Sequence, residues 1–356
     1  MVAEPTSDAI PEVPGPAPRT AWLRSTFDPA ARTSGKTGSV MRPRVRLSVN
    51  MAFGFLIRGT IRQVLLTGGI MRTFGVSSAM LTPFSESGEI DTARLCTHSL
   101  SVIKNGADSV TLFGTTGEGA SIGMEERATG IEALLVTGVA ARKIVLGIAA
   151  NSVSDASRQV AEGRRYGVTD FLLMPPFYFQ APSDAGLLDW HMQLFQRSDA
   201  AAKFILYHIP QVSGVGLPVH LVGRMVGMAK ERIRAIKDSS GSWDNARSLL
   251  ALKTVLVLVG DERILHKAVA IGAVGAISGM ANLYPDRIKR IVETAREDAA
   301  LTAEVSRILS VPVVSGLKAV LATHRNDPEW ERIRAPLTPL GNKARAFVLG
   351  SGEKVA

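Results

Sequence analysis

Cysteine is almost absent from this chain, since Cys96 is the only one among 356 residues. A single cysteine excludes an intramolecular disulfide, and nothing in the composition indicates an oxidising compartment, so we expect a reducing, cytoplasmic setting. Aromatic residues are also scarce, at 6% of the chain, and no basic helix is interleaved with them. More than half of the net charge of +9 comes from residues 1–70, which argues against nucleic-acid binding by the rest of the chain.

Long hydrophobic runs and the spacing of a zinc motif are missing as well. Residues 47–70 are apolar but are interrupted by Arg58 and Arg62, so no run of about 18 uncharged residues is available to span a membrane. The six histidines never fall at the spacing of a zinc motif such as HExxH, and no GK[ST] follows the glycine-rich turn "GTTGEG", as a phosphate-binding loop would require. We therefore expect no membrane partner, no nucleic-acid partner and no metal site.

Residues 1–70 differ in composition from the rest of the chain. The first 40 residues are rich in Pro, Ala, Ser, Thr and Gly and have no sustained periodicity, which predicts disorder. Residues 47–70 are rich in arginine and poor in acids, and they loosely resemble a targeting peptide without a clear cleavage pattern. The interpretation that we prefer is a coding start placed too far upstream, with the protein beginning at Met71. We accordingly treat residues 1–70 as a disordered or non-native extension.

Short apolar, β-branched runs alternate with helical segments from Thr73 onward. Each run is nearly continuous in apolar residues, which is typical of parallel strands that are covered on both faces. The eight runs are residues 76–82, 109–113, 144–149, 170–174, 204–209, 233–237, 255–259 and 274–278. Eight βα units predict an α/β fold of the (βα)8, or TIM, barrel type over residues 71–285. We expect residues 286–356 to form an appended C-terminal helical subdomain and tail.

Helix patterns occupy the segments between the runs. The clearest are residues 124–141, 154–167 and 217–231. Ser154 stands before an apolar-periodic stretch and is expected to cap its helix, which Gly167 should end. A doubly wound open sheet is the alternative architecture, and it would need a GxGxxG or Walker loop near its first strand. The first run continues into "LTPFSESG" instead, so the barrel is preferred.

Polar residues gather directly after the predicted strands, where a (βα)8 barrel carries its active site. Because all parallel strands of a barrel end at the same rim, we expect these side chains to face one site. The candidates are Gly114, Thr115, Thr116, Tyr207, Lys237, Ser239, Asp261 and Glu262.

Lys237 ends the sixth run, and a lysine there is unusual in an otherwise apolar strand. Period-2 counting places Ile233, Ala235 and Lys237 on one face, so the amine is expected to point into the barrel. Apolar surroundings disfavour an ammonium group, and the neutral amine can attack a carbonyl to form a Schiff base that stabilises a neighbouring carbanion. The alternative is a lysine that reaches solvent or pairs with Asp238 or Glu262.

Tyr207 lies in the fifth run, beside the strand that carries the lysine. A buried phenol at this place can move protons to and from a forming imine, and a core tyrosine with a satisfied hydroxyl is the alternative. The turn "GTTGEG" follows the second run, where its glycines allow close backbone approach and Thr115 and Thr116 add hydroxyls. Such a turn can bind a carboxylate. Glu118 is expected to be a structural acid near a helix start.

The stretches "GTTGE", "YHIP", "IKDSSG" and "GAVGAISGMAN", at the ends of strands two, five, six and eight, resemble the dihydrodipicolinate synthase and N-acetylneuraminate lyase family of pyruvate-handling class I aldolases. The resemblance covers about residues 73–340. It implies that the enzyme binds its substrate covalently through its own lysine and needs no cofactor. It also implies a homo-oligomer, a tetramer or a dimer, because such enzymes are typically dimers of dimers.

The resemblance assigns roles to individual residues. The imine-forming lysine corresponds to Lys237, and the proton-shuttling tyrosine corresponds to Tyr207. The threonine pair that contacts the oxo-acid carboxylate and joins a hydroxyl relay corresponds to Thr115 and Thr116. In synthases a tyrosine of a neighbouring subunit, from a P-Y-Y-N stretch, completes this relay, and "PFYF" offers Tyr178 at the matching place.

Other positions fit or depart from the family pattern. Ile277 matches the residue whose backbone carbonyl faces the active site, while Asp261 and Glu262 lie where sugar-acid lyases hold substrate hydroxyls. Synthases usually read "YNVPSRTG", and their arginine binds the carboxylate of the aldehyde; "YHIPQVSG" has Val212 there. Losing that partner weakens binding of a carboxylated aldehyde. His208 replaces the usual asparagine for no reason that the sequence shows.

The expected function is therefore that of a Schiff-base lyase, an aldolase or a dehydratase, that acts on a 2-oxo acid and cleaves or condenses pyruvate with an aldehyde. The preferred 2-oxo acid carries hydroxyls, or an aromatic side chain given Phe177 and Phe179. The alternatives are 4-hydroxy-tetrahydrodipicolinate synthase of lysine biosynthesis and a non-catalytic barrel that binds 2-oxo acids.

Overall fold

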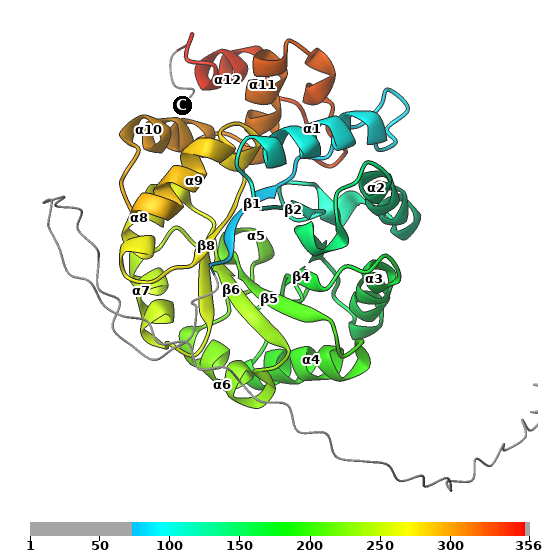
Figure 1. Ribbon diagram of the computed structural model, residues 1–356, viewed down its shortest axis with the longest axis vertical. Coiled ribbons are helices and arrows are strands. Elements are labelled where there is room, and N and C mark those ends of the chain that lie inside the picture. The colour runs from blue at the N-terminus through cyan, green and yellow to red at the C-terminus, as the bar shows by residue number, and fades with distance from the viewer. Residues whose placement is uncertain (1–72, 353–356) are drawn as a thin grey trace, which may run out of the picture. The chain divides into compact units, whose positions relative to one another are not determined.

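The structure is a computed structural model that describes residues 73–352, so the expected extension over residues 1–70 lies outside the described residues. Eight parallel strands form a closed barrel, in which each strand pairs with the next and the last pairs with the first (Figure 1). The (βα)8 prediction is confirmed. The strands are β1 (Gly75–Ala79), β2 (Ser109–Leu112), β3 (Ile144–Ile148), β4 (Asp170–Leu173), β5 (Lys203–His208), β6 (Ile233–Asp238), β7 (Leu256–Val259) and β8 (Gly275–Ser278).

Helices cover the outside of the barrel and connect successive strands. The sequence-based boundary assigned residues from 286 onward to a C-terminal subdomain. In the structure, α9 packs against β1, β8 and α8, so it completes the ring of barrel helices and the C-terminal helices begin after it. A short helix, α5 (Pro210–Ser213), follows β5. The barrel helices are α1 (Thr92–Lys104), α2 (Met124–Val136), α3 (Val153–Arg165), α4 (Asp184–Arg197), α6 (Val219–Ala229), α7 (Trp243–Ala251), α8 (Glu262–Ala270) and α9 (Pro285–Thr294).

The expected C-terminal helices are present, and they gather beside α9 and α1 on one side of the barrel (Figure 1). α11 packs against the short 3-10 turns η3 and η4 and against α12. Within residues 73–352 no single helix is long and apolar enough to cross a membrane, and α10 and α11 meet that test only as a pair bent by 120°. These elements are η3 (Met280–Asn282), α10 (Ala299–Ile308), α11 (Val313–Arg325), η4 (Pro328–Glu331) and α12 (Asn342–Val348).

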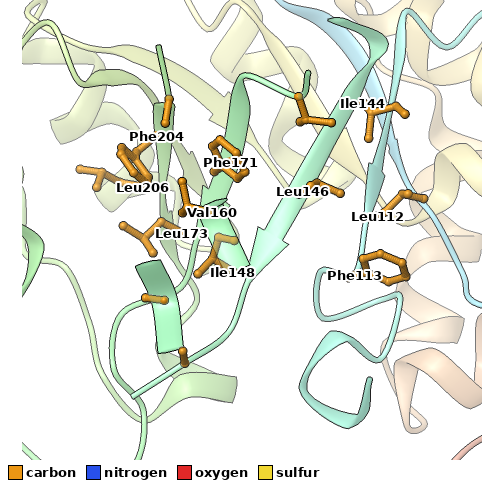
Figure 2. Packing of buried hydrophobic residues seen from close by; sticks show 14 of the residues in the cluster. Leu112, Phe113, Ile144, Leu146, Ile148, Val160, Phe171, Leu173, Phe204 and Leu206 are labelled. Carbon is orange, nitrogen blue, oxygen red and sulfur yellow. The ribbon is translucent and has the colours of Figure 1, made fainter. Parts of the chain in front are cut away.

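Both faces of the strands are buried, which accounts for their continuous apolar sequence. Alternate side chains such as Val145, Ile205 and Ala235 belong to the cluster that fills the barrel interior. Their neighbours, among them Phe171 and Phe204, belong to the layer between the sheet and the helices, where their rings lie 6.0 Å apart (Figure 2). Because successive side chains point to opposite faces of a strand, each apolar run contributes residues to both the barrel interior and the outer layer.

An irregularity in β6 corrects the period-2 count. Phe204 of β5 pairs with Ile233, but Ile205 pairs with Ala235, so β6 has one extra residue at this point. Ile233 consequently packs in the outer layer, whereas Ala235 faces the barrel interior. The prediction that Ile233 shares a face with Lys237 was wrong, because a bulge shifts every residue before it to the other face. The prediction that Lys237 points into the barrel is unaffected, because Lys237 and Ala235 both follow the bulge and lie on the same face of β6.

The first turn of α3 also differs from the sequence-based expectation. α3 begins at Val153, and the Ser152 hydroxyl accepts the N–H of Asp155 at 3.0 Å. The N-cap is therefore Ser152, and Ser154 lies within the helix. Both serines have the side chain that a cap requires, and only the backbone conformation distinguishes them. Gly167 ends the helix as expected, in a left-handed conformation with φ of 79° directly after the C-cap.

Two histidines in the helix layer make stability depend on pH. His191 of α4 and His98 of α1 are fully buried, and burial lowers the pKa of each ring to about 4. An unfolded histidine titrates near pH ~6.5, so each neutral ring favours folding above that pH, and this contribution is lost as the pH falls toward the folded pKa. Between pH ~7.5 and ~5 we expect the free energy of unfolding, measured by urea denaturation, to fall by about 2 kcal/mol per histidine.

A His191→Phe variant isolates one of these contributions. The His191 ring lies 5.0 Å from the ring of Trp190 and 6.2 Å from that of Phe195, so an aromatic replacement suits the site without titrating. The loss of stability on acidification should be smaller in the variant than in the parent protein by about 2 kcal/mol. An unchanged pH dependence would show that His191 does not contribute.

Candidate active site

A cavity of about 520 Å³ opens at the carboxyl ends of the strands. Seven of the ten predicted site residues line it: Thr115, Thr116, Tyr207, Lys237, Ser239, Asp261 and Glu262. They come from the turn after β2, from β5 and β6, and from the segments that follow β6 and β7. The common rim expected from the sequence thus exists. Of the other three, Gly114 lines an adjoining cavity, Ile277 is buried in the barrel interior, and Tyr178 is exposed.

Lys237 and Tyr207 are paired neighbours on adjacent strands. The lysine Nζ donates a hydrogen bond to the tyrosine hydroxyl over 3.3 Å and lies 4.3 Å from the centre of the ring. Both residues are buried, with 5% and 3% of their surface exposed. The same tyrosine hydroxyl lies 3.4 Å from the Thr115 Oγ1. An amine, a phenol and an alcohol therefore form a continuous hydrogen-bonded row in the cavity.

The carboxylates considered as ion-pair partners for Lys237 bind other groups. Asp238 accepts the N–H of Ser240 and the side-chain amide of Asn245, both at 2.9 Å. Glu262 accepts the hydroxyl of Ser278 at 2.5 Å. Lys237 is thus directed to the phenol and the cavity, which is the arrangement that a nucleophilic amine with a proton-transfer partner requires.

Gly260 lies directly after β7, and because it has no side chain the Lys237 side chain can pass close to it. A Cβ on Gly260 would lie 2.8 Å from the Lys237 Cε and 2.0 Å from the Ser239 Oγ. Any larger residue would therefore displace the lysine or the serine. We did not select this glycine from the sequence, and its position directly after the strand next to β6 is the signal that could have found it.

The turn that carries the two threonines is tightly wound. Phe113 before it and Glu118 at its end have left-handed backbone conformations, with φ of 57° and 54°. A Cβ on Gly119 would lie 1.8 Å from the Phe113 carbonyl oxygen, so the close approach requires glycine. The N–H of Glu118 bonds to the Thr115 carbonyl within the turn. Left-handed non-glycine residues are strained and concentrate at functional sites, which fits a turn that presents Thr115 to the cavity.

A second polar group lies where β7 meets α8. The Asp261 carboxylate caps α8 and accepts two hydrogen bonds from the Arg263 guanidinium, at 3.0 and 2.6 Å. Burial raises the pKa of the Glu262 carboxyl. Arg263 also lines the cavity and was missed in the sequence, where it looked like an ordinary surface residue of a helix. Within residues 73–352 no three His, Cys, Asp or Glu side chains gather as a metal site requires.

The C-terminal helices supply an apolar wall to the same cavity. The wall comes from α10, α11 and the residues between them, namely Val305, Ile308, Leu309, Val313, Val314 and Leu317. The sequence indicated helices here but not their contact with the site, because that contact depends on how α10 and α11 pack against the barrel. The cavity lining is therefore both polar and apolar.

His208 has a structural explanation that the sequence did not offer. Its Nδ1 accepts the N–H of Leu217 at 2.9 Å, and burial lowers the pKa of the ring. A neutral His208 thus ties β5 to the end of the loop over residues 209–217. This loop carries Val212, which is 55% exposed and lines both the main cavity and the adjoining one.

The adjoining cavity has a volume of about 390 Å³ and shares Thr115, Tyr207 and Val212 with the main one. Tyr178 lines neither: its side chain is 75% exposed and stacks edge-to-face on Phe179 at 5.4 Å. Its predicted role in a neighbouring subunit stays a prediction, as does the role of the Ile277 carbonyl. Glu118 forms an ion pair with Lys318 and lines the adjoining cavity, and its expected role as a structural acid stays a prediction.

Comparisons with known proteins find relatives over most of this chain. A DapA-like lyase of Chloroflexus aurantiacus is 29% identical over 79% of this chain and 96% of its own length. A 4-hydroxy-tetrahydrodipicolinate synthase of Methanothermobacter thermautotrophicus is 32% identical over 63% of this chain and 80% of its own length. The crystal structure of dihydrodipicolinate synthase from Agrobacterium tumefaciens is 36% identical and has a TM-score of 0.76, with 78% of this chain and 98% of that chain covered.

A family model covers most of the chain. Residues 72–349 match the dihydrodipicolinate synthetase family, a span that includes the whole barrel and the C-terminal helices. The match thus extends over every residue that lines the cavity. This chain is therefore a lyase of the dihydrodipicolinate synthetase family.

Proposed function

We propose that Lys237 is the residue with which this lyase forms a Schiff base to pyruvate or another 2-oxo acid. The observation that supports it is the buried Lys237 amine, 3.3 Å from the Tyr207 hydroxyl in a cavity at the carboxyl ends of the strands. The amine adds to the C2 carbonyl, and loss of water gives the imine. Removal of a C3 proton then gives an enamine, which attacks an aldehyde, and the reverse sequence cleaves the product.

Tyr207 and the threonine turn have complementary roles in this proposal. Tyr207 lies between Lys237 and Thr115, so it can carry the proton that leaves the amine and return it to the departing oxygen. Thr115 and Thr116 line the cavity and offer hydroxyls to the carboxylate of the oxo acid. No other cofactor takes part in the proposed chemistry, since the imine itself withdraws the electrons.

The polar residues that line the cavity support an aldehyde that carries hydroxyl groups. The paired Asp261 and Arg263, with Glu262 and Ser239 nearby, offer both hydrogen-bond donors and acceptors, and the α10–α11 wall suits a hydrocarbon part. Synthase activity of the kind named for the Methanothermobacter relative is the second candidate. It is disfavoured because Val212 offers no charge to a carboxylated aldehyde, while Asp261 already binds the Arg263 guanidinium.

A homo-oligomer is part of the proposal, with Tyr178 as the reason. Tyr178 and Phe179 are exposed by 75% and 65%, and two neighbouring exposed aromatic rings are typical of a surface that a partner covers. A second copy of this chain would bring a tyrosine hydroxyl to the Thr115 end of the relay. A cytoplasmic setting stays a prediction.

Reductive trapping tests the assignment of Lys237. Borohydride added with pyruvate should convert the imine into a stable amine, and peptide mass spectrometry should locate the added mass on Lys237. A Lys237→Ala variant is the control, and it should acquire no adduct. An adduct that survives this substitution, or no adduct in the parent protein, contradicts the proposal.

A further inference from the structure

A fully buried ion pair joins the threonine turn to the C-terminal helices. The Lys318 Nζ of α11 lies 2.5 Å from the Glu118 Oε1 at the end of the turn. The side chains are 1% and 0% exposed, so neither charge reaches solvent. Two hundred residues separate the partners in sequence, and neither lines the main cavity.

Further contacts fix both members of the pair. Lys318 also donates to the Arg332 carbonyl at 2.5 Å, and the other Glu118 oxygen accepts the N–H of Arg334 at 3.0 Å. The charged ends of Lys318 and Arg334 each lie over the ring of Phe84, at 4.6 and 4.4 Å from its centre. Three segments that are distant in sequence therefore meet at the end of the turn.

Stability alone does not account for this pair. Burial lowers the pKa of Lys318, which shows that the charged form is costly at this place. Apolar residues of similar volume often replace a buried ion pair without loss of stability, and in some proteins such a pair instead fixes one arrangement of the chain. The arrangement fixed here is that of Glu118, whose left-handed conformation ends the turn.

The turn and α11 also meet inside the active site. Leu317, the residue before Lys318, lines the main cavity together with Thr116. Gly279 lies between them, since a Cβ there would be 3.2 Å from the Leu317 Cδ1 and 3.6 Å from the Thr116 Oγ1. Glu118 is only two residues from Thr116, and its N–H bonds to the Thr115 carbonyl. A shift of Glu118 would therefore move both threonine hydroxyls.

We propose that Lys318 is a positioning residue for the 2-oxo acid: through Glu118 it holds the turn so that Thr115 and Thr116 meet the substrate carboxylate. The inference rests on the proposed function, because it assigns the carboxylate to these hydroxyls. It predicts that losing the ion pair impairs reaction with an oxo acid and spares reaction with a ketone that has no carboxylate.

The test compares imine trapping with pyruvate and with methyl pyruvate, whose carboxylate is esterified, using cyanoborohydride and mass spectrometry. In Lys318→Met we expect the trapping rate with pyruvate to fall by about tenfold or more, because a small misplacement of a binding group is costly. The rate with methyl pyruvate should stay within about twofold of the parent value, as expected if only the carboxylate contact is lost. Equal losses with both ketones, or no loss, would overturn the proposal.

Two further variants separate positioning from folding. The double variant Glu118→Gln with Lys318→Met removes both charges, so no charge is left unpaired and its urea denaturation should match that of the parent protein. The ratio of its trapping rate with pyruvate to that with methyl pyruvate should still be lower than in the parent protein. A ratio equal to that of the parent would overturn the proposal even if Lys318→Met fails to fold. Lys289→Met is the matched control, since Lys289 pairs with Asp108 at 3.0 Å on an exposed face. Its ratio of trapping rates with pyruvate and methyl pyruvate should equal that of the parent protein.

The proposed function can fail separately in the same experiment. A parent protein that traps neither ketone overturns the Schiff-base assignment and, with it, the role of Lys318. A parent protein that traps both, with variants that behave as it does, overturns only the role of Lys318.

Discussion

Replacing Tyr207 by phenylalanine is expected to slow proton transfer by about 10²- to 10⁴-fold while still allowing the imine to be trapped. The Tyr207 hydroxyl is the group that lies within hydrogen-bonding reach of both the Lys237 amine and the Thr115 hydroxyl. Exchange of the pyruvate methyl protons with deuterated water, followed by NMR, measures enamine formation directly. This measurement does not require the aldehyde to be known.

The control for this experiment is Tyr166→Phe. Tyr166 caps the end of α3, where the Arg165 guanidinium lies 6.0 Å from its ring, and it lines neither active-site cavity. Its exchange rate should equal that of the parent protein. Exchange at the parent rate in Tyr207→Phe would show that another group, or water, carries the proton.

A Val212→Arg substitution is expected to raise kcat/KM for a carboxylated aldehyde, relative to a hydroxylated one, by about 10- to 100-fold. This corresponds to one charge-assisted hydrogen-bonded contact. Val212 is half exposed and lines the cavity, and the loop that carries it is tied to β5 by His208, so a longer side chain can extend into the site. Condensation of pyruvate with succinic semialdehyde and with glyceraldehyde would give the ratio.

Val212→Met is the matched control, because methionine adds length without charge. It should leave the ratio of the two aldehydes near the parent value. A parent protein that already prefers succinic semialdehyde would contradict our inference, based on Val212, that a carboxylated aldehyde is a poor substrate. Loss of that preference in Arg263→Leu would then identify Arg263 as the residue that binds the carboxylate and would favour the synthase alternative.

The sequence by itself determined the barrel and the centre of the site. Continuous apolar runs require strands that are buried on both faces, and eight of them with intervening helices leave few architectures. Parallel strands end at one rim, so residues directly after them had to converge. Lys237 and Tyr207 stand near the ends of consecutive strands, so the sequence predicted that they are neighbours, and the register of β5 and β6 then pairs them.

Only the tertiary structure decided the rest, because those features depend on contacts between residues that are far apart in the chain. The bulge in β6 appears only when Ile233 and Ala235 are matched to β5, and α9 becomes a barrel helix only by packing on β1. Gly260 matters because of the space beside Lys237. The Glu118–Lys318 pair joins residues 200 positions apart, and no local pattern of charge or hydrophobicity records which two buried charges will meet.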